Sequence, residues 1–380
     1  MPTTNPPKFT ATSRMAAAAL GAALVATSAS FATAGAATVR PHSSVTLELY
    51  SAQGYDSYVV NAFNKANPGI NVVLTDGSTG PLLTKIAAEQ ASHSPKWNLM
   101  WADGSTWAAA FDTSGWSQKS IIPKGTAYDA MGLANKPADG AFAPTGVTVT
   151  GGLCYDKVAV ANNHVALPTT WAGLTKVPKG SLGMNNPSFS GPTFPLIASV
   201  MAHLGGISST KNPTAAQVKT AIAKGEAFFQ TLKNNGLQVH HTNGPTLGAM
   251  ESNPATLDMA TIQTSACYGD IAGGYWPSGA VKYLDYSAEL PSSIAISKDV
   301  SKAQLAAAEK FVAFVLSVNG QQTMQKGDPT GDGLFWPVIS KVTPESGVPA
   351  FSSTKAFAIN PYVWGPQQNG IDTWFTNNIA

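Results

Sequence analysis

The chain has 380 residues, enough for two domains of ordinary size. Hydrophobic residues make up 44% and charged residues only 12%, against roughly 25% charged in a typical soluble domain, and this composition excludes an intrinsically disordered chain. The 23 Lys and Arg nearly balance the 21 Asp and Glu, which excludes the basic stripe that binding to nucleic acid or to an anionic membrane requires.

The N-terminus has the pattern of an export signal. A positively charged segment precedes an apolar, alanine-rich stretch at residues 15–26, and small residues with A-x-A spacing follow within residues 32–36. We expect residues 1–36 to be a signal peptide rather than a membrane anchor, because the apolar stretch is short. No cysteine lies near the cleavage region, so we expect an unlipidated protein that an outer membrane retains in the periplasm.

The next segment alternates strands with helices. Apolar alternation and apolar runs predict strands at residues 45–50, 70–74 and 99–101. Apolar residues at helical spacing predict helices at residues 55–66 and 80–87 between these strands. This order is typical of a parallel, doubly wound sheet.

A long extended run at residues 145–155 then predicts a crossing into a second lobe. The alternation resumes beyond it, with strands at 182–184, 257–264 and 293–296 and helices at 197–204, 215–234 and 302–318. We therefore expect an α/β fold of two doubly wound lobes.

Several predicted strands end in short turns of hydroxyl residues that begin helices. These turns are Ser51–Gln53, Ser78–Gly80, Ser105–Thr106 and Ser190–Thr193. Serine and threonine are good N-caps, which explains any one turn by itself. Ligands of open α/β sheets sit beyond the carboxyl ends of the strands, where helix N-termini offer unpaired N–H groups. Together the turns predict a binding site at that edge.

The order of these and other short motifs carries a family resemblance. The motifs are Tyr50–Gln53, Gly77–Leu83, Cys154–Val158, Leu167–Trp171, Asn186–Gly191, Ala308–Phe314 and Gly320–Gln322. From residue 45 onward the chain resembles the type II extracellular solute-binding proteins of ABC importers, in the branch with ferric-iron, phosphonate, sugar-phosphate and thiamine receptors.

The resemblance implies a type II periplasmic-binding-protein fold, with two lobes joined by a hinge and a ligand cleft that closes between them. It also implies discontinuous lobes, which we place at residues 44–148 with 291–330 and at residues 149–290 with 331–380. The implied partners are a small-molecule ligand and the membrane permease of an ABC importer, and we expect a monomer.

Iron binding can be tested on the residues. By motif register, Gly54, Asp103 and the pair Ser265–Ala266 stand where the iron receptors of this branch carry a histidine, a glutamate and adjacent tyrosines. Only Tyr268 offers a nearby phenolate. Ferric iron needs several anionic oxygen ligands, so we expect no metal site, while a receptor for chelated iron stays an alternative.

The ligand's charge stays open. Arg14 and Arg40 are the only arginines, so the folded domain lacks the usual bidentate clamp for phosphate or carboxylate. Helix-start hydroxyls could still hold a phosphate or phosphonate, although Pro192 removes one backbone donor. A neutral or cationic ligand is equally allowed, with Asp103 as its counter-charge and Tyr155, Tyr268 or Trp276 as apolar walls. The predicted ligand-binding residues are Ser51, Gln53, Ser78, Thr79, Asp103, Tyr155, Ser190, Gly191, Thr193 and Tyr268.

No catalytic pattern stands out. The G-x-S-x-G, H-E-x-x-H and phosphate-loop motifs are missing from the sequence, so we expect a receptor without enzymatic activity or cofactor. Asp328–Gly333 is similar to a calcium loop but lacks the ligand spacing, and we interpret it as a turn. A secreted enzyme on the same fold and a sensing subunit are the alternatives.

The two cysteines, Cys154 and Cys267, allow two interpretations. In an exported chain they would form a disulfide that closes a long loop, or they are two separate buried thiols. The sequence leaves both open.

Overall fold

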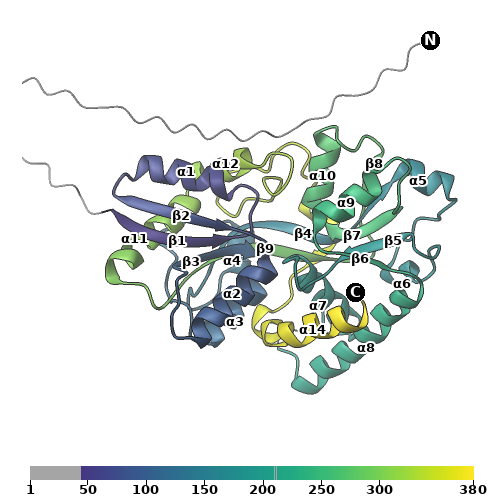
Figure 1. Cartoon of the computed structure of the whole chain (residues 1–380), viewed down its shortest axis with the longest axis horizontal. Helices are drawn as coiled ribbons and strands as arrows, with labels where there is room; N and C mark the ends of the chain where they lie inside the picture. Colours follow the sequence, from purple (N-terminus) through teal and green to yellow (C-terminus); the bar gives the residue numbers. More distant parts are fainter. Residues whose placement is uncertain (1–43, 209, 211) are drawn as a thin grey trace, which may run out of the picture. The chain divides into compact units, whose positions relative to one another are not determined.

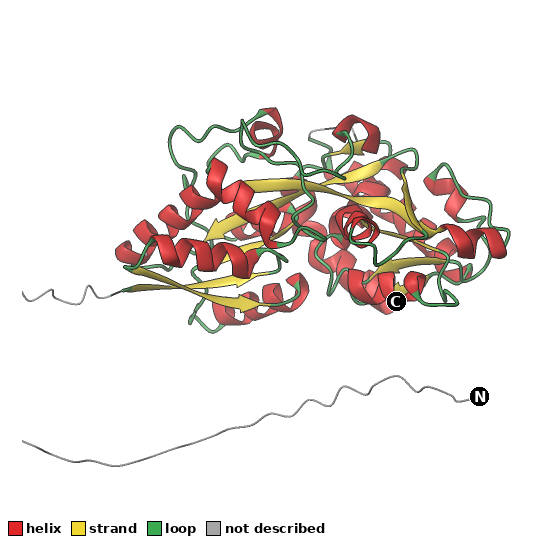
Figure 2. Cartoon of the chain, turned by 90° about the horizontal axis from the view of Figure 1, so that it is seen from above, coloured by secondary structure: helices red, strands yellow, loops and turns green. Residues whose placement is uncertain are grey.

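The computed structural model describes residues 44–208, 210 and 212–380. Within this part the strands form one ten-stranded sheet, with helices on both of its faces (Figures 1 and 2). The predicted signal peptide at residues 1–36 lies outside the described residues. No helix of the described part is long and apolar enough to cross a membrane.

One end of the sheet consists of parallel strands and is called the first lobe. Its elements are β1 (Val45–Ser51), α1 (Asp56–Ala66), β2 (Ile70–Asp76), α2 (Thr79–Ala91), β3 (Leu99–Asp103), α3 (Ser105–Thr113) and α4 (Ala130–Asn135). Val59 and Phe63 lie four residues apart on one face of α1 and are buried in the same core as Leu47 and Leu49 of β1. The predicted alternation of strand and helix is confirmed.

The other end of the sheet is called the second lobe. Its elements are α5 (Lys157–Asn162), α6 (Trp171–Leu174), β5 (Leu182–Asn185), α7 (Thr193–Leu204), α8 (Ala215–Asn234), β6 (Gln238–His240), α9 (Asn243–Glu251), β7 (Met259–Gln263), α10 (Thr264–Ala272) and β8 (Gly279–Lys282). Strand β5 pairs in parallel with both β6 and β7. Helix α7 is apolar on all sides because it packs between the sheet and α8, and its residues 193–202 are all buried.

Two long antiparallel strands join the lobes. These are β4 (Ala143–Asp156) and β9 (Ser287–Ile296). Strand β9 pairs with β3 on one side and with residues 143–150 of β4 on the other, while residues 150–155 of β4 pair with β7. The strand order is therefore β2-β1-β3-β9-β4-β7-β5-β6, with β8 beside β4 and β10 (Ala356–Phe357) beside β9. The predicted fold of two α/β lobes is confirmed.

The C-terminal part of the chain visits both lobes. Helices α11 (Lys302–Val315) and α12 (Val318–Gly327) return to the first lobe, where Phe311 and Met324 join its core, as does Phe335 beyond them. The chain then runs through η1 (Phe351–Thr354), α13 (Pro361–Trp364) and η2 (Gly365–Gln367) to α14 (Gln368–Asn378), whose Phe375 lies in the core of the second lobe. The division at residues 44–148 with 291–330 and 149–290 with 331–380 stays a prediction.

The two cysteines form a disulfide. Cys154 of β4 is bonded to Cys267 of α10 across a sequence separation of 113 residues. Both are fully buried in a small apolar cluster with Met250 and Trp276. The structure therefore confirms the first of the two interpretations, and the bond staples the middle of the chain within the second lobe.

Replacing both cysteines by alanine is expected to lower the free energy of unfolding by about 4–5 kcal/mol, because a loop of this length loses much of its entropy when it is closed in the unfolded chain. Urea denaturation of the oxidised protein and the double variant checks this. A reductant that lowers the midpoint of the wild type and leaves the variant unchanged is the control. Equal midpoints for the oxidised wild type and the variant would contradict the prediction.

Candidate functional site

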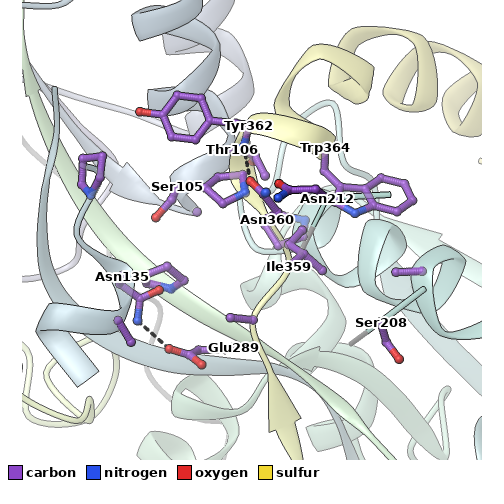
Figure 3. A pocket seen from close by; sticks show the side chains of 18 of the residues that line it. Ser105, Thr106, Asn135, Ser208, Asn212, Glu289, Ile359, Asn360, Tyr362 and Trp364 are labelled. Atoms are coloured by element: carbon purple, nitrogen blue, oxygen red, sulfur yellow. Dashed lines mark hydrogen bonds between the residues drawn. The ribbon is translucent and has the colours of Figure 1, made fainter. Parts of the chain in front are cut away.

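Two cavities lie on opposite faces of β9. The larger, of about 800 Å³, is bounded by Glu289 and Pro291, and Glu289 there accepts a hydrogen bond from Asn135 (Figure 3). The smaller, of about 530 Å³, includes Asp103, which accepts a hydrogen bond from Ser292 of the same strand. Neighbouring residues of a strand point to opposite faces, so β9 separates the two spaces.

The smaller cavity lies at the carboxyl ends of the strands of both lobes and is called the cleft cavity. Its wall is formed by residues at, or just beyond, the carboxyl ends of β1, β2 and β3 in the first lobe and of β5, β6 and β7 in the second. Ligands of open α/β sheets bind at this edge. The cleft cavity is therefore the candidate functional site.

Most of the predicted binding residues reach the wall of the cleft cavity. The structure brings together Gln53, Ser78, Thr79, Asp103, Ser190 and Gly191. Their role in binding stays a prediction, but residues from opposite halves of the chain do share one space.

The other predicted binding residues lie off this wall. Ser51 is fully buried at the end of β1, and Thr193 is buried in the first turn of α7. Tyr155 packs against the core of the second lobe, and the hydroxyl of Tyr268 donates a hydrogen bond to Tyr283. The structure does not bring these four side chains to the cleft cavity.

The two lobes touch at the mouth of the cleft cavity. The backbone N–H of Gly80, in the first turn of α2, donates a hydrogen bond to the carbonyl of Phe189 at 3.4 Å. A Cβ atom on Gly80 would lie 1.9 Å from the carbonyl oxygen of Ser188, and a Cβ atom on Gly191 would lie 2.4 Å from Oγ1 of Thr79. Only glycine allows the two backbones to approach so closely, so the structure has the lobes closed at this point.

Asp103 is the centre of a hydrogen-bond network between the lobes. Its carboxylate accepts hydrogen bonds from Nε2 of Gln53 at 3.1 Å, from Nε2 of Gln263 at 3.0 Å and from the hydroxyl of Ser292. Burial raises the pKa of Asp103, and these three donors oppose the rise. The network joins a first-lobe strand end, a second-lobe strand end and the connecting strand β9.

Gln263 was not among the predicted binding residues. Its Oε1 accepts a hydrogen bond from Asn243, which directs its Nε2 toward the carboxylates of Asp103 and Asp332. Its position at the end of β7 could have indicated a binding role, because residues at the ends of the neighbouring strands also line the cleft cavity. A glutamine by itself does not indicate a binding site, and only the fold shows that Gln263 contacts Asp103 and Asp332.

Asp332 was also missed. Residues 328–333 form the expected turn, in which Oδ2 of Asp328 accepts the backbone N–H of Asp332 at 2.7 Å. The turn places Asp332 on the wall of the cleft cavity, where it accepts hydrogen bonds from the N–H of Gly54 at 2.8 Å and from Gln263 at 3.3 Å. Burial, together with the carboxylates of Asp103, Asp328 and Asp56, raises the pKa of Asp332 to about 8.

The wall of the cleft cavity is acidic. Four of its described residues are carboxylates, namely Asp56, Asp76, Asp103 and Asp332, and none is a lysine, arginine or histidine. Asp56 is 3% exposed, its Oδ2 has no hydrogen-bond partner, and burial raises its pKa to about 6. Two like charges about 5 Å apart cost on the order of 3 kcal/mol at an effective dielectric constant of about 20. The described wall thus brings carboxyl groups together without a basic partner, and this arrangement opposes their ionising at the same time.

The described side chains of the cleft cavity do not form a metal site. Among the described residues, no group of three or more His, Cys, Asp or Glu side chains is placed to hold a metal ion. Gly54 and Asp103, which stand at two of the iron receptors' ligand positions, both lie on the wall, while Ser265 is buried in α10.

Comparisons with known proteins agree with this geometry. The family model described as "Bacterial extracellular solute-binding protein" matches residues 59–359. Among curated proteins, none matches the sequence.

Three solved structures are similar in fold. Iron-bound HitA from Pseudomonas aeruginosa has a TM-score of 0.68 at 18% identity, over 87% of this chain and 98% of that one. AfuA from Actinobacillus pleuropneumoniae with bound fructose-6-phosphate has a TM-score of 0.73 at 15% identity, over 88% and 98%. A periplasmic thiamin binding protein has a TM-score of 0.66 at 16% identity, over 91% and 100%. At these identities the likeness shows the fold alone.

Gly80→Ala is expected to hold the lobes apart, because the added Cβ would overlap the carbonyl of Ser188 only in the closed arrangement. We expect a larger radius of gyration than in the wild type, measured by small-angle X-ray scattering, with an unfolding free energy within about 1 kcal/mol of the wild type.

Gly77→Ala is the matched control, since its Cβ would meet only the side chain of Leu82, at 3.6 Å, an ordinary contact distance. A Gly80→Ala variant as compact as the Gly77→Ala variant would show that the closed contact does not form in solution.

Asp103→Ala is expected to lower the free energy of unfolding by about 2–3 kcal/mol, because it leaves the amide donors of Gln53 and Gln263 without their acceptor. Urea denaturation measures the change. Asp76→Ala, at an exposed residue on the same wall, is the control and is expected to change stability by less than about 0.5 kcal/mol. Equal effects of the two substitutions would remove Asp103 from the network.

Proposed function

The chain belongs to the bacterial extracellular solute-binding protein family, and from this premise we propose that it captures a small solute in the cleft cavity and delivers it to the permease of an ABC importer. The lobes open to admit the solute and close over it, and the closed form is the one that the permease recognises.

The observation that carries this proposal is the cleft cavity itself. Strand ends of both lobes wall a space of about 530 Å³, which lies within the usual range of small-molecule sites, roughly 300–1,000 Å³. The lobes meet across its mouth at Gly80 and Gly191, and the chain passes between them through β4, β9 and the C-terminal segment that ends in α14. A space that closes by such a motion suits capture and release.

The place of action follows from the family, whose members work outside the cytoplasm. We propose that residues 1–36 direct export and are removed, that no lipid is attached, and that the mature protein is a periplasmic monomer. The permease would then meet it at the outer face of the cytoplasmic membrane.

Catalysis is the second candidate and has less support. The described wall carries hydroxyls at Ser57, Ser78 and Ser190 but has no histidine, lysine or cysteine beside them. A serine nucleophile usually needs such a base for activation. A secreted enzyme would therefore have to use the aspartates of the wall alone.

Tryptophan fluorescence of the mature protein, titrated with the solutes named for its structural neighbours and with related small molecules, tests the proposal. We expect one molecule to bind per protein, a smaller radius of gyration in the complex, and recovery of the solute unchanged. A substrate converted to product over many turnovers would contradict the receptor function. Binding without compaction would contradict capture by lobe closure.

A further inference from the structure

We propose that the solute is an organic cation, bound by the carboxylates of Asp332 and Asp56 in the cleft cavity. This inference rests on the proposed receptor function and names the class of solute. An amine or a quaternary ammonium group would supply the positive charge that the protein's own wall lacks.

The carboxylates of the cleft cavity have no basic partner on the described wall. The described wall has four carboxylates and no basic side chain. The ion pairs found in the described part of the chain join Lys85 to Glu89 and Lys119 to Asp112 and Asp139, and none of these residues lies on the wall. A positive group from outside is therefore the natural partner of the cleft carboxylates.

One carboxylate oxygen of the wall lacks a hydrogen-bond partner. Asp56 lines the cleft cavity, is 3% exposed, and its Oδ2 has no partner at hydrogen-bond distance, although the hydroxyl of Ser51 lies near enough to lower its pKa. Buried polar atoms of native proteins are seldom left without a partner, and such exceptions recur at functional sites. A ligand with N–H donors, or a positive charge close by, would satisfy this atom.

Asp103 has a different part. Three protein donors already occupy its carboxylate, whereas Asp332 accepts only one backbone N–H and the longer contact from Gln263. Asp332 therefore has more capacity left for a ligand. We assign Asp103 to positioning and Asp332 to direct contact, which differs from the expectation that Asp103 itself is the counter-charge.

An anionic solute fits this wall less well. Five helix N-termini reach the wall, those of α1, α2, α7, α9 and α10, at Asp56, Ser78, Pro192, Thr242 and Gln263. Each contributes roughly half a positive charge, so the five helices together supply roughly two to three positive charges beside the four carboxyl groups, and two of these groups, Asp332 and Asp56, have raised pKa values. A phosphate would add its negative charge beside these carboxyl groups, and the described wall has no arginine to hold it.

The size and lining of the cavity favour an organic group over a bare metal ion. The described residues offer no group of three or more ligands placed for a metal, and a volume of about 530 Å³ exceeds what one ion needs. Phe189 lies on the wall with its ring stacked on His241, at 4.3 Å between ring centroids. An aromatic face beside carboxylates is a common setting for an ammonium group.

Isothermal titration calorimetry on the mature protein tests the inference. The cationic probes are choline, spermidine and thiamine, and the others are inorganic phosphate, fructose 6-phosphate and maltose. We expect at least one cation to bind with a Kd of about 10 µM or lower, and the anionic and neutral probes to bind at least about 100-fold more weakly.

The variants identify the site. Asp332→Asn keeps the shape and removes the charge, and is expected to weaken the cation at least about 30-fold, with about tenfold for Asp56→Asn. Asp299→Asn removes the same charge at an exposed residue off the wall and is expected to stay within about twofold. Equal losses in all three variants would overturn the assignment.

A ligand-free measurement keeps the inference testable without a known solute. Asp332 is faced by the carboxylates of Asp103, Asp328 and Asp56. Its folded-state pKa is raised above the unfolded value, so it stabilises the fold at low pH and loses this contribution as the pH rises through about 8. We expect Asp332→Asn to raise the melting temperature by a few degrees at about pH 9, and to raise it less at about pH 6.

The outcomes separate this inference from the receptor function. Tight binding of an anionic or neutral probe, unaffected by Asp332→Asn, overturns the cation and leaves the receptor standing. Failure of every cationic probe, together with an equal change in melting temperature at both pH values, also overturns the cation. Conversion of a bound probe into product overturns the receptor instead.

Discussion

The pairing of β4 with β9 is the constraint on which the rest of the structure depends. These two antiparallel strands continue the sheet from β3 of the first lobe to β7 of the second, so they hold both sets of strand ends at one edge. The cleft cavity exists because of this shared edge. Ser292 of β9 binds Asp103 on the cleft side, while Glu289 of the same strand faces the larger cavity behind.

Polar contacts join the two lobes across the cleft. Gln263 reaches Asp103 and Asp332, and Gly80 reaches Phe189, each from the opposite lobe. The same contacts confine several carboxylates to a small space. Bringing these carboxyl groups together carries an electrostatic cost, and a positively charged solute of the class proposed above would relieve it on closure.

Local sequence patterns predict the elements of this fold well, and they predict long-range placement poorly. The strand at residues 45–50 and the helix at 55–66 show their periods directly, because each buries one face in its own lobe. Likewise, the long run at 145–155 is visible as β4. The cysteine count allows a bond between Cys154 and Cys267, but only the fold shows that the two sulfur atoms meet.

The candidate site was predictable where it is made of strand ends and not where a distant turn enters. Ser78 and Ser190 follow from the rule for open sheets. Asp332 lies 278 residues from Gly54, to which it is hydrogen bonded, and nothing near Asp332 in sequence indicates that approach. Tyr155 and Tyr268 lie at the end of β4 and within α10, and their side chains turn into the second lobe and toward Tyr283.

The disulfide stabilises the fold at a position where it does not restrict the motion of the lobes. Cys154 and Cys267 both lie in the second lobe, so the covalent bond stiffens that lobe and does not link it to the first. Formation of this bond can then raise the free energy of unfolding without restraining the rotation of one lobe relative to the other. A disulfide across the mouth of the cleft cavity would also have stabilised the fold, but it would have held the two lobes permanently closed.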